Sequence, residues 1–318
     1  MKILVTGSSG FVGKRVLDMA AAKGWDCLAQ VRKAATKNAI IEEVTVPVIN
    51  AATDWSHALT GVECIVHCAA RVHQMQESEA EALVAYNEVN TLGTLQLARQ
   101  AAALGVKRFV FLSSIKVNGE YTDVGSPFTA QVSQPPSDPY GTSKYDAEIG
   151  LTQIAQETGL DVVIIRPPLV YGPGVKANFQ SMLCWVKKGI PLPLGAINNK
   201  RSLVFIDNLV DLILTAAVHN NAVNGTFLVS DGHDVSTTEL LNAVAVAMDK
   251  SSRLLPIPMA WIQLAAKLVG KPQIAQRLCG SLQVDISETQ KKLNWTPPVS
   301  FAVGIKTTVD SFVGNSCD

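Results

Sequence analysis

The 318-residue sequence has little of what marks a membrane-spanning, disulfide-rich or nucleic-acid-binding protein. Its six cysteines are scattered and form no Cys-x-x-Cys pair, which favours a reduced protein without a metal site. No apolar run reaches the roughly 18 residues of a membrane span, and MKILVTG does not look like a signal peptide. With 27 basic and 27 acidic residues, no net charge attracts nucleic acid. We therefore expect a cytoplasmic protein that neither inserts into membranes nor binds nucleic acid.

Apolar residues make up 47% of the chain, enough for a large core. Short apolar runs alternate with helical patterns, such as residues 81–105 and 140–159, through the first half of the sequence. The strand-like runs are KILVTG, CLAQV, VTVPVI, CIVHCAA, RFVFLSS and DVVIIRPP. Strands that are apolar throughout and separated by helices predict a parallel sheet covered on both faces. We predict an α/β fold, with a Rossmann-type doubly wound sheet in residues 1–172. Residues 173–318 would form mainly a smaller, interleaved substrate lobe, with some strands returning to that sheet.

A glycine-rich turn joins the first predicted strand to the first predicted helix. Gly7, Gly10 and Gly13 have the spacing G-x-x-G-x-x-G, and Phe11 and Val12 begin the helix. Glycine allows a tight turn and a close approach of backbone to a pyrophosphate, which the free N–H groups of a helix start can bind. The turn predicts a dinucleotide site.

The end of the second predicted strand indicates which dinucleotide binds. An acid there would bind the ribose 2′-hydroxyl of NAD, but the strand ends in Val31 and Arg32 with no carboxylate. Because arginine can bind a 2′-phosphate with two hydrogen bonds, Arg32 favours NADP(H), and NAD(H) stays open. Ala69 and Ala70, at the end of a later strand, are small enough to let the chain pass close to the cofactor.

Three residues suggest a catalytic group. Tyr140 and Lys144 form Tyr-x-x-x-Lys at a helix start, and Ser114 ends the strand RFVFLSS. Residues four apart share a helix face, so the ammonium, together with the cationic nicotinamide of an oxidised cofactor, is expected to lower the tyrosine pKa from its usual value of about 10. Tyr140 could then exchange a proton with a substrate oxygen while hydride moves to or from a nicotinamide.

The sequence resembles the extended short-chain dehydrogenase/reductase family, in its NAD-dependent epimerase/dehydratase group. The motifs that carry the resemblance, in the family's order, are VTGSSGFVG, HCAA, NTLGT, SSIKVNG, YGTSK, RPPLVYGPG, RSLVFIDN and DISETQKKLNW. The resemblance implies that Ser114, Tyr140 and Lys144 are catalytic. It implies further that Asn90 supports the active-site backbone, and that Pro167 joins Asn90, Tyr140 and Lys144 around the cofactor.

The resemblance also implies a sugar nucleotide as substrate. Asn178 matches an asparagine near the phosphates, and Arg201 and Arg277 match arginines that contact the diphosphate. A UDP-sugar is the partner we expect, together with a second copy of the chain in a homodimer formed through residues 81–104 and 140–158.

The reaction itself is less determined. Sugar-nucleotide dehydratases carry Asp-Glu where this sequence has Ile115 and Lys116, which argues against elimination. A 4-ketoreductase of UDP-4-keto-6-deoxy-N-acetylhexosamine in surface polysaccharide synthesis is our main interpretation, because Arg32 fits NADPH. A 4-epimerase of UDP-glucose or UDP-N-acetylglucosamine is the alternative. A non-catalytic NADP-binding regulator is a third, from another class.

Overall fold

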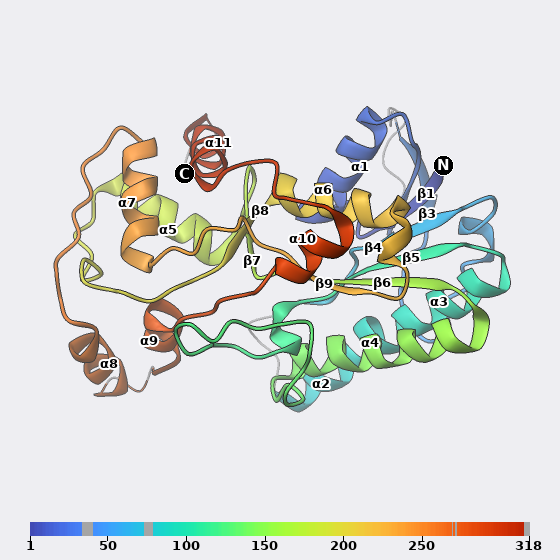
Figure 1. The fold of residues 1–318 in the computed structure, drawn as a ribbon, viewed down its shortest axis with the longest axis horizontal. Helices are drawn as coiled ribbons and strands as arrows, with labels where there is room; N and C mark the ends of the chain where they lie inside the picture. The colour runs from blue at the N-terminus through green and yellow to red at the C-terminus, as the bar shows by residue number, and fades with distance from the viewer. Residues whose placement is uncertain (34–40, 73–78, 269, 271, 315–318) are drawn as a thin grey trace.

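The computed structural model describes residues 1–33, 41–72, 79–268, 270 and 272–314 (Figure 1). Within these residues a seven-stranded sheet runs in the order β3-β2-β1-β4-β5-β6-β9, and its neighbouring strands are parallel. The strands are β1 Lys2–Thr6, β2 Asp26–Val31, β3 Glu42–Thr45, β4 Cys64–His67, β5 Arg108–Leu112, β6 Asp161–Arg166 and β9 Thr226–Leu228. The strand order reverses at β1, between β2 and β4, which is where ligands bind in open α/β sheets.

Helices cover both faces of this sheet (Figure 1). Side chains alternate along β1, so that Ile3 and Val5 join one apolar cluster while Leu4 joins another. On the first face lie α1 Phe11–Ala22 and α6 Ile206–Val218; on the second lie α3 Gly93–Ala103 and α4 Pro139–Thr158. The predicted doubly wound fold is confirmed.

A smaller lobe lies beside the carboxyl ends of the strands (Figure 1). Its two-stranded parallel sheet pairs β7 Leu169–Tyr171 with β8 Leu203–Phe205. Its helices are α5 Ala177–Lys188, α7 Thr237–Ala247, α8 Met259–Leu268, α9 Pro272–Cys279 and α11 Phe301–Gly314, whereas α10 Ser287–Leu293 packs against β9 of the large sheet. No helix among the described residues combines the length and apolarity needed to cross a membrane. The boundary at residue 172 stays a prediction.

One predicted helix differs in form. Residues 81–105 read as continuous helical pattern, but the structure has α2 at Glu79–Tyr86, then a π-helix at Asn87–Leu92, then α3. A π-helix inserts extra backbone into a turn and is often found at functional sites. Here it carries Asn90, one of the predicted site residues.

Candidate active site

The glycine turn forms a cradle that side chains would fill. Gly7 has a φ of 65°, and a Cβ on it would lie 2.7 Å from the Ala69 nitrogen at the end of β4. A Cβ on Gly13 would lie 2.3 Å from the Gly7 carbonyl oxygen. Gly10, the N-cap of α1, provides no capping side chain, so the N–H groups of the first turn, which includes Phe11 and Val12, are available to an anion. These residues fit a dinucleotide pyrophosphate, with Ala69 against the turn.

The end of β2 is tied to this cradle by Gln30. Its buried side chain accepts a hydrogen bond from the Gly7 N–H (3.2 Å) and donates to the Val46 carbonyl (2.8 Å). Arg32, two residues on, is exposed. Its side chain is therefore accessible to a ligand at the strand end.

The catalytic candidates lie at the carboxyl ends of β5 and β6. Ser114 follows β5, where its hydroxyl accepts from the Lys116 N–H (3.3 Å). The N–H of Ile115, the next residue, donates to the Pro167 carbonyl (3.0 Å), and this hydrogen bond places Pro167 beside Ser114. Lys144, only 1% exposed, donates its Nζ to the Leu112 carbonyl at 2.9 Å. The structure thus brings Ser114, Lys144 and Pro167 to one sheet edge.

Tyr140 begins the same helix as Lys144. Asp138 caps α4 by accepting from the Gly141 N–H, and Pro139 occupies the first turn. Burial, with smaller contributions from Asp138 and Tyr86, raises the pKa of Tyr140 to about 12. Lys144 is not among the causes of this shift, and its ammonium donates to the Leu112 carbonyl; the lowering expected with an oxidised cofactor bound stays a prediction. A low pKa at Tyr140 therefore needs a further positive charge beside the phenol.

Burial also changes Lys144. It lowers the pKa of the ammonium to about 8, against weaker opposing effects of Cys68 and Glu148. The Nζ lies 4.5 Å from the centre of the Phe111 ring, a contact that favours the charged form. Lys144 thus remains mainly a cation at neutral pH.

Asn90 supports the start of α4. Its Nδ2 donates to the Ser143 hydroxyl (3.0 Å) and the Arg71 carbonyl (3.2 Å), and the Ser143 hydroxyl donates to the Tyr140 carbonyl (2.8 Å). Because both N–H groups of Asn90 are used within the protein, it could offer a cofactor only its oxygen, which already accepts from the Arg71 N–H (2.8 Å). We assign Asn90 to the support of the Tyr140 backbone rather than to cofactor contact.

A buried hydrogen-bond chain links Asn90 to the cradle. The Thr94 hydroxyl donates its only proton to the Asn90 carbonyl, so it must accept from Nε2–H of His67 at 2.9 Å. Nδ1 of the neutral ring then accepts from the Thr6 hydroxyl (2.7 Å), which itself accepts from the Ala69 N–H (3.3 Å). This accounting fixes His67 as the Nε2–H tautomer.

Burial, and next the charge of Lys144, lowers the pKa of His67 to about 3. We expect the ¹⁵N spectrum of His67 to show an unprotonated Nδ1 that does not change down to about pH 5. The unfolded chain takes up this proton from about pH 6.5 downward, so the protein should lose stability across that window until about pH 3. A His67→Phe variant assigns the signal; a protonated Nδ1 at neutral pH would contradict the tautomer assignment, and a ring that titrates near pH 6.5 would contradict the lowered pKa.

The predicted phosphate-binding residues are only partly brought together. Arg201 donates to the carbonyls of Arg277 (3.1 Å) and Gly280 (3.0 Å), and burial lowers its pKa. Arg201 forms no ion pair with a carboxylate among the described residues, so its positive charge is available to pair with a bound anion. The Arg277 side chain is exposed, and so is Asn178 in the first turn of α5. Within the described part of the chain no hydrogen bond connects Asn178 to either arginine.

The sequence analysis missed a buried ion pair behind the catalytic residues. Arg166, at the end of β6, donates to both carboxylate oxygens of Glu148 (2.9 and 2.5 Å), which also accepts from Ser113. Arg166 further donates to Asn118 Oδ1 (3.1 Å). Glu148 lies one helical turn after Lys144 on the buried face of α4. An acidic residue at a position that the helical pattern predicts to be buried was the signal in the sequence that could have indicated this ion pair.

Lys116 also has a defined place. Its ammonium pairs with Glu120 (2.9 Å) and Asp138 (3.2 Å), while Ile115 is buried. Neither residue offers a free acid or base for elimination.

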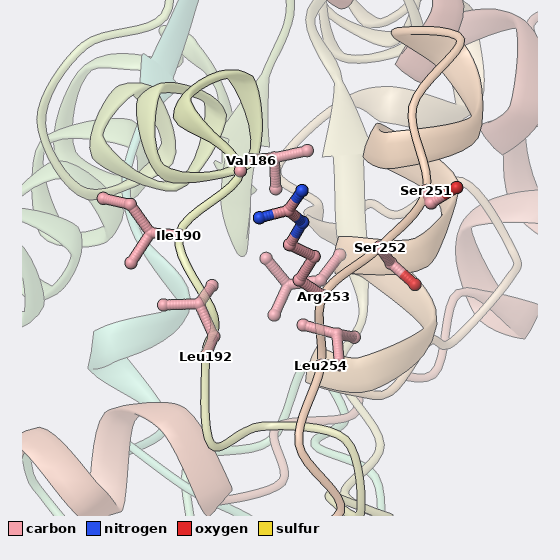
Figure 2. A pocket seen from close by; sticks show the side chains of 9 residues that line it. Val186, Ile190, Leu192, Ser251, Ser252, Arg253 and Leu254 are labelled. Carbon is pink, nitrogen blue, oxygen red and sulfur yellow. The ribbon is translucent and has the colours of Figure 1, made fainter.

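A hollow in the small lobe lies elsewhere, between the end of α5 and the segment before α8 (Figure 2). Its volume of about 10 Å³ suffices for one water molecule. The Arg253 side chain projects into the middle of the space in this view (Figure 2). No predicted site residue lines it.

A glycine cradle at the switch point of a doubly wound sheet, with serine, tyrosine and buried lysine at the next strand ends, defines a dinucleotide-dependent oxidoreductase-type enzyme. The model of the NAD dependent epimerase/dehydratase family matches residues 3–230. The chain belongs to this family.

Two curated relatives and two solved structures show the range of similarity. The chain is 50% identical over 316 residues to a UDP-glucose 4-epimerase of Vibrio cholerae, covering 98% of this chain and 95% of that one. It is 28% identical to a Mycolicibacterium smegmatis UDP-glucose 4-epimerase, covering 99% and 100%. A Bacillus cereus UDP-glucuronic acid 4-epimerase structure gives a TM-score of 0.78 at 18% identity over 99% of both chains. The Thermus thermophilus UDP-glucose 4-epimerase gives 0.77 at 24%, over 99% and 100%.

Proposed function

We propose that the protein is a UDP-sugar 4-epimerase that acts on UDP-glucose or a close relative. The observation that carries this proposal is the 50% identity to the Vibrio cholerae UDP-glucose 4-epimerase over nearly the whole chain. This favours the alternative of the sequence analysis over its main interpretation, since nothing in the relatives points specifically to a 4-ketoreductase. The pairing of Lys116 with Glu120 and Asp138 further supports the argument against a dehydratase.

In this proposal a nicotinamide cofactor held at the glycine turn would supply a reversible hydride acceptor for C4 of the sugar, so that C4 can be oxidised and then reduced on its other face. Tyr140 accepts the proton of the C4 hydroxyl at its Oη and gives it back to the new epimer. Ser114 hydrogen-bonds the same oxygen through its hydroxyl. Lys144 holds a positive charge nearby and binds the nicotinamide ribose, and Arg201 with Arg277 binds the diphosphate.

For the cofactor we propose NAD(H), held by Gly7, Gly10 and Gly13 with Phe11 and Val12 in the first turn of α1. The Bacillus cereus and Thermus thermophilus structures are complexes with NAD, which supports this choice. The expected NADP(H) preference rested on Arg32, whose exposed side chain is free to meet a 2′-phosphate or to stay in solvent. Cofactor released by denaturing the purified protein would decide between the two.

We also keep the homodimer as a proposal. The helices expected to form it expose apolar side chains, on α2 (Leu83, Val84), the π-helix (Leu92) and α4 (Ile149).

The test follows UDP-glucose and UDP-galactose in the purified protein. We expect interconversion with no net oxidation or reduction of cofactor, because each turnover restores it. Stoichiometric loss of NADPH with UDP-4-keto-6-deoxy-N-acetylhexosamine, and no epimer, would instead establish the 4-ketoreductase. Tight dinucleotide binding without turnover of any UDP-sugar would indicate the regulator.

A further inference from the structure

Helix α8 presents an apolar face to solvent. Trp261, Leu264 and Leu268 are 67%, 52% and 79% exposed, and their spacing of three and four residues places them on one side of the helix. Ile257, just before the helix, is 36% exposed. We call these four residues the α8 face.

The opposite side of α8 fixes this orientation. Met259 and Ile262 pack against a buried cluster that includes Leu194, Ile197 and Leu241. The helix therefore packs on the surface, yet it keeps Trp261, Leu264 and Leu268 outside. Burying a side chain of this size contributes about 1.5 to 3 kcal/mol of favourable free energy, so covering the α8 face with a binding partner would be favourable.

The charge around this helix differs from that of the whole chain. Residues 250–284 contain five basic side chains and no Asp or Glu, although the whole sequence is balanced at 27 of each. The five are Lys250, Arg253, Lys267, Lys271 and Arg277. Those with a described side chain form no ion pair with a described carboxylate. The segment that carries the α8 face is thus positively charged.

These features select among possible occupants. A second copy of the chain docking through the same face would bring the two positive segments together, which is unfavourable. A ten-residue helix is too short to span a bilayer, but it can lie in the interface plane. Tryptophan and lysine side chains favour that interface, and basic residues bind anionic headgroups.

We propose that the α8 face docks on an anionic membrane surface. The docking is peripheral, with the apolar side chains in the headgroup region and Lys267 on the phosphates. Helix α9 follows directly, and the Arg277 carbonyl at its end holds Arg201. Docking would therefore bring the substrate lobe, and the arginines we assign to the diphosphate, towards the bilayer.

The test is sedimentation with vesicles of phosphatidylglycerol and phosphatidylcholine, compared with phosphatidylcholine alone. We expect binding to the anionic vesicles only, weakened by salt, with a blue shift of Trp261 fluorescence that the Trp261→Phe variant lacks. The double variant Trp261→Gln/Leu264→Gln should bind at least about tenfold more weakly. Val246→Gln, at an exposed apolar residue of α7, is the matched control and should bind like the unchanged protein.

Failure to sediment with anionic vesicles would overturn the proposal, as would equal binding by the double variant. Conversion of a dimer to a monomer by the double variant would assign the face to a second copy instead. Epimerase activity in free solution should be unchanged in both variants, which checks folding without depending on vesicle binding. Leu268→Gln, at the most exposed position, repeats the test with one substitution if the double variant fails to fold.

Discussion

Replacing Tyr140 with phenylalanine is expected to lower kcat on the order of a thousandfold, because general acid–base catalysis is lost while the ring stays. The phenylalanine keeps the edge-on contact with Tyr86, whose ring centre lies 5.9 Å away. The Asp138 cap and the Lys144 hydrogen bond are also unaffected, so cofactor binding and thermal stability should change little. The measurement is the rate of UDP-glucose and UDP-galactose interconversion at saturating substrate.

Tyr145→Phe is the matched control, since it removes a phenol from the same helix five residues on. Its kcat should stay within about twofold of the unchanged protein, as is usual for a change that touches neither substrate nor a buried network. If Tyr140→Phe retained a comparable rate, the proton at C4 would have to move through another group. Ser114 would be the next candidate.

The second large effect is on stability. Glu148→Leu should reduce the free energy of unfolding by about 3 to 5 kcal/mol, because it leaves the Arg166 guanidinium buried without its carboxylate. Each side chain of the pair is only 5% exposed, and the remaining partners of Arg166 are the Asn118 side chain and the Ala130 carbonyl. Urea unfolding followed by circular dichroism gives the value.

The exposed Lys306–Asp310 pair provides the comparison. Asp310→Asn should change stability by less than about 1 kcal/mol, since both partners are in solvent. A Glu148→Leu/Arg166→Met double variant should recover part of the loss, because two apolar side chains leave no unpaired charge. A loss below about 1 kcal/mol in Glu148→Leu would mean that water reaches the pair.

The large sheet and the placement of Gly7, Ser114 and Lys144 could be predicted because each depends on local pattern. Apolar strands, a glycine turn between strand and helix, and a four-residue helical spacing are all visible in one sequence. What brings Ser114 and Lys144 together is the packing of α4 beside β5, where the Lys144 ammonium donates to the Leu112 carbonyl at the strand end.

The interactions between side chains could not be predicted in the same way. His67 reads as one more polar residue in a strand, but its tautomer depends on Thr6 and Thr94, which lie 61 and 27 residues away in the sequence. The π-helix that carries Asn90 leaves no local pattern, because it is stabilised by tertiary hydrogen bonds to Arg71 and Ser143. The direction of the Lys144 ammonium likewise depends on the Leu112 backbone carbonyl, which only the structure locates.

The pairing of β9 with β6 has a consequence for synthesis on the ribosome. Residues 226–228 form the outermost strand of the large sheet, beside β6 at 161–166. Until that segment and α6 emerge, β6 has an open hydrogen-bonding edge, and Ile3, Val5 and Val163 lack much of their cover. A nascent chain halted at residue 172 would expose an aggregation-prone apolar surface, so chaperones should bind it until residues 206–228 have emerged.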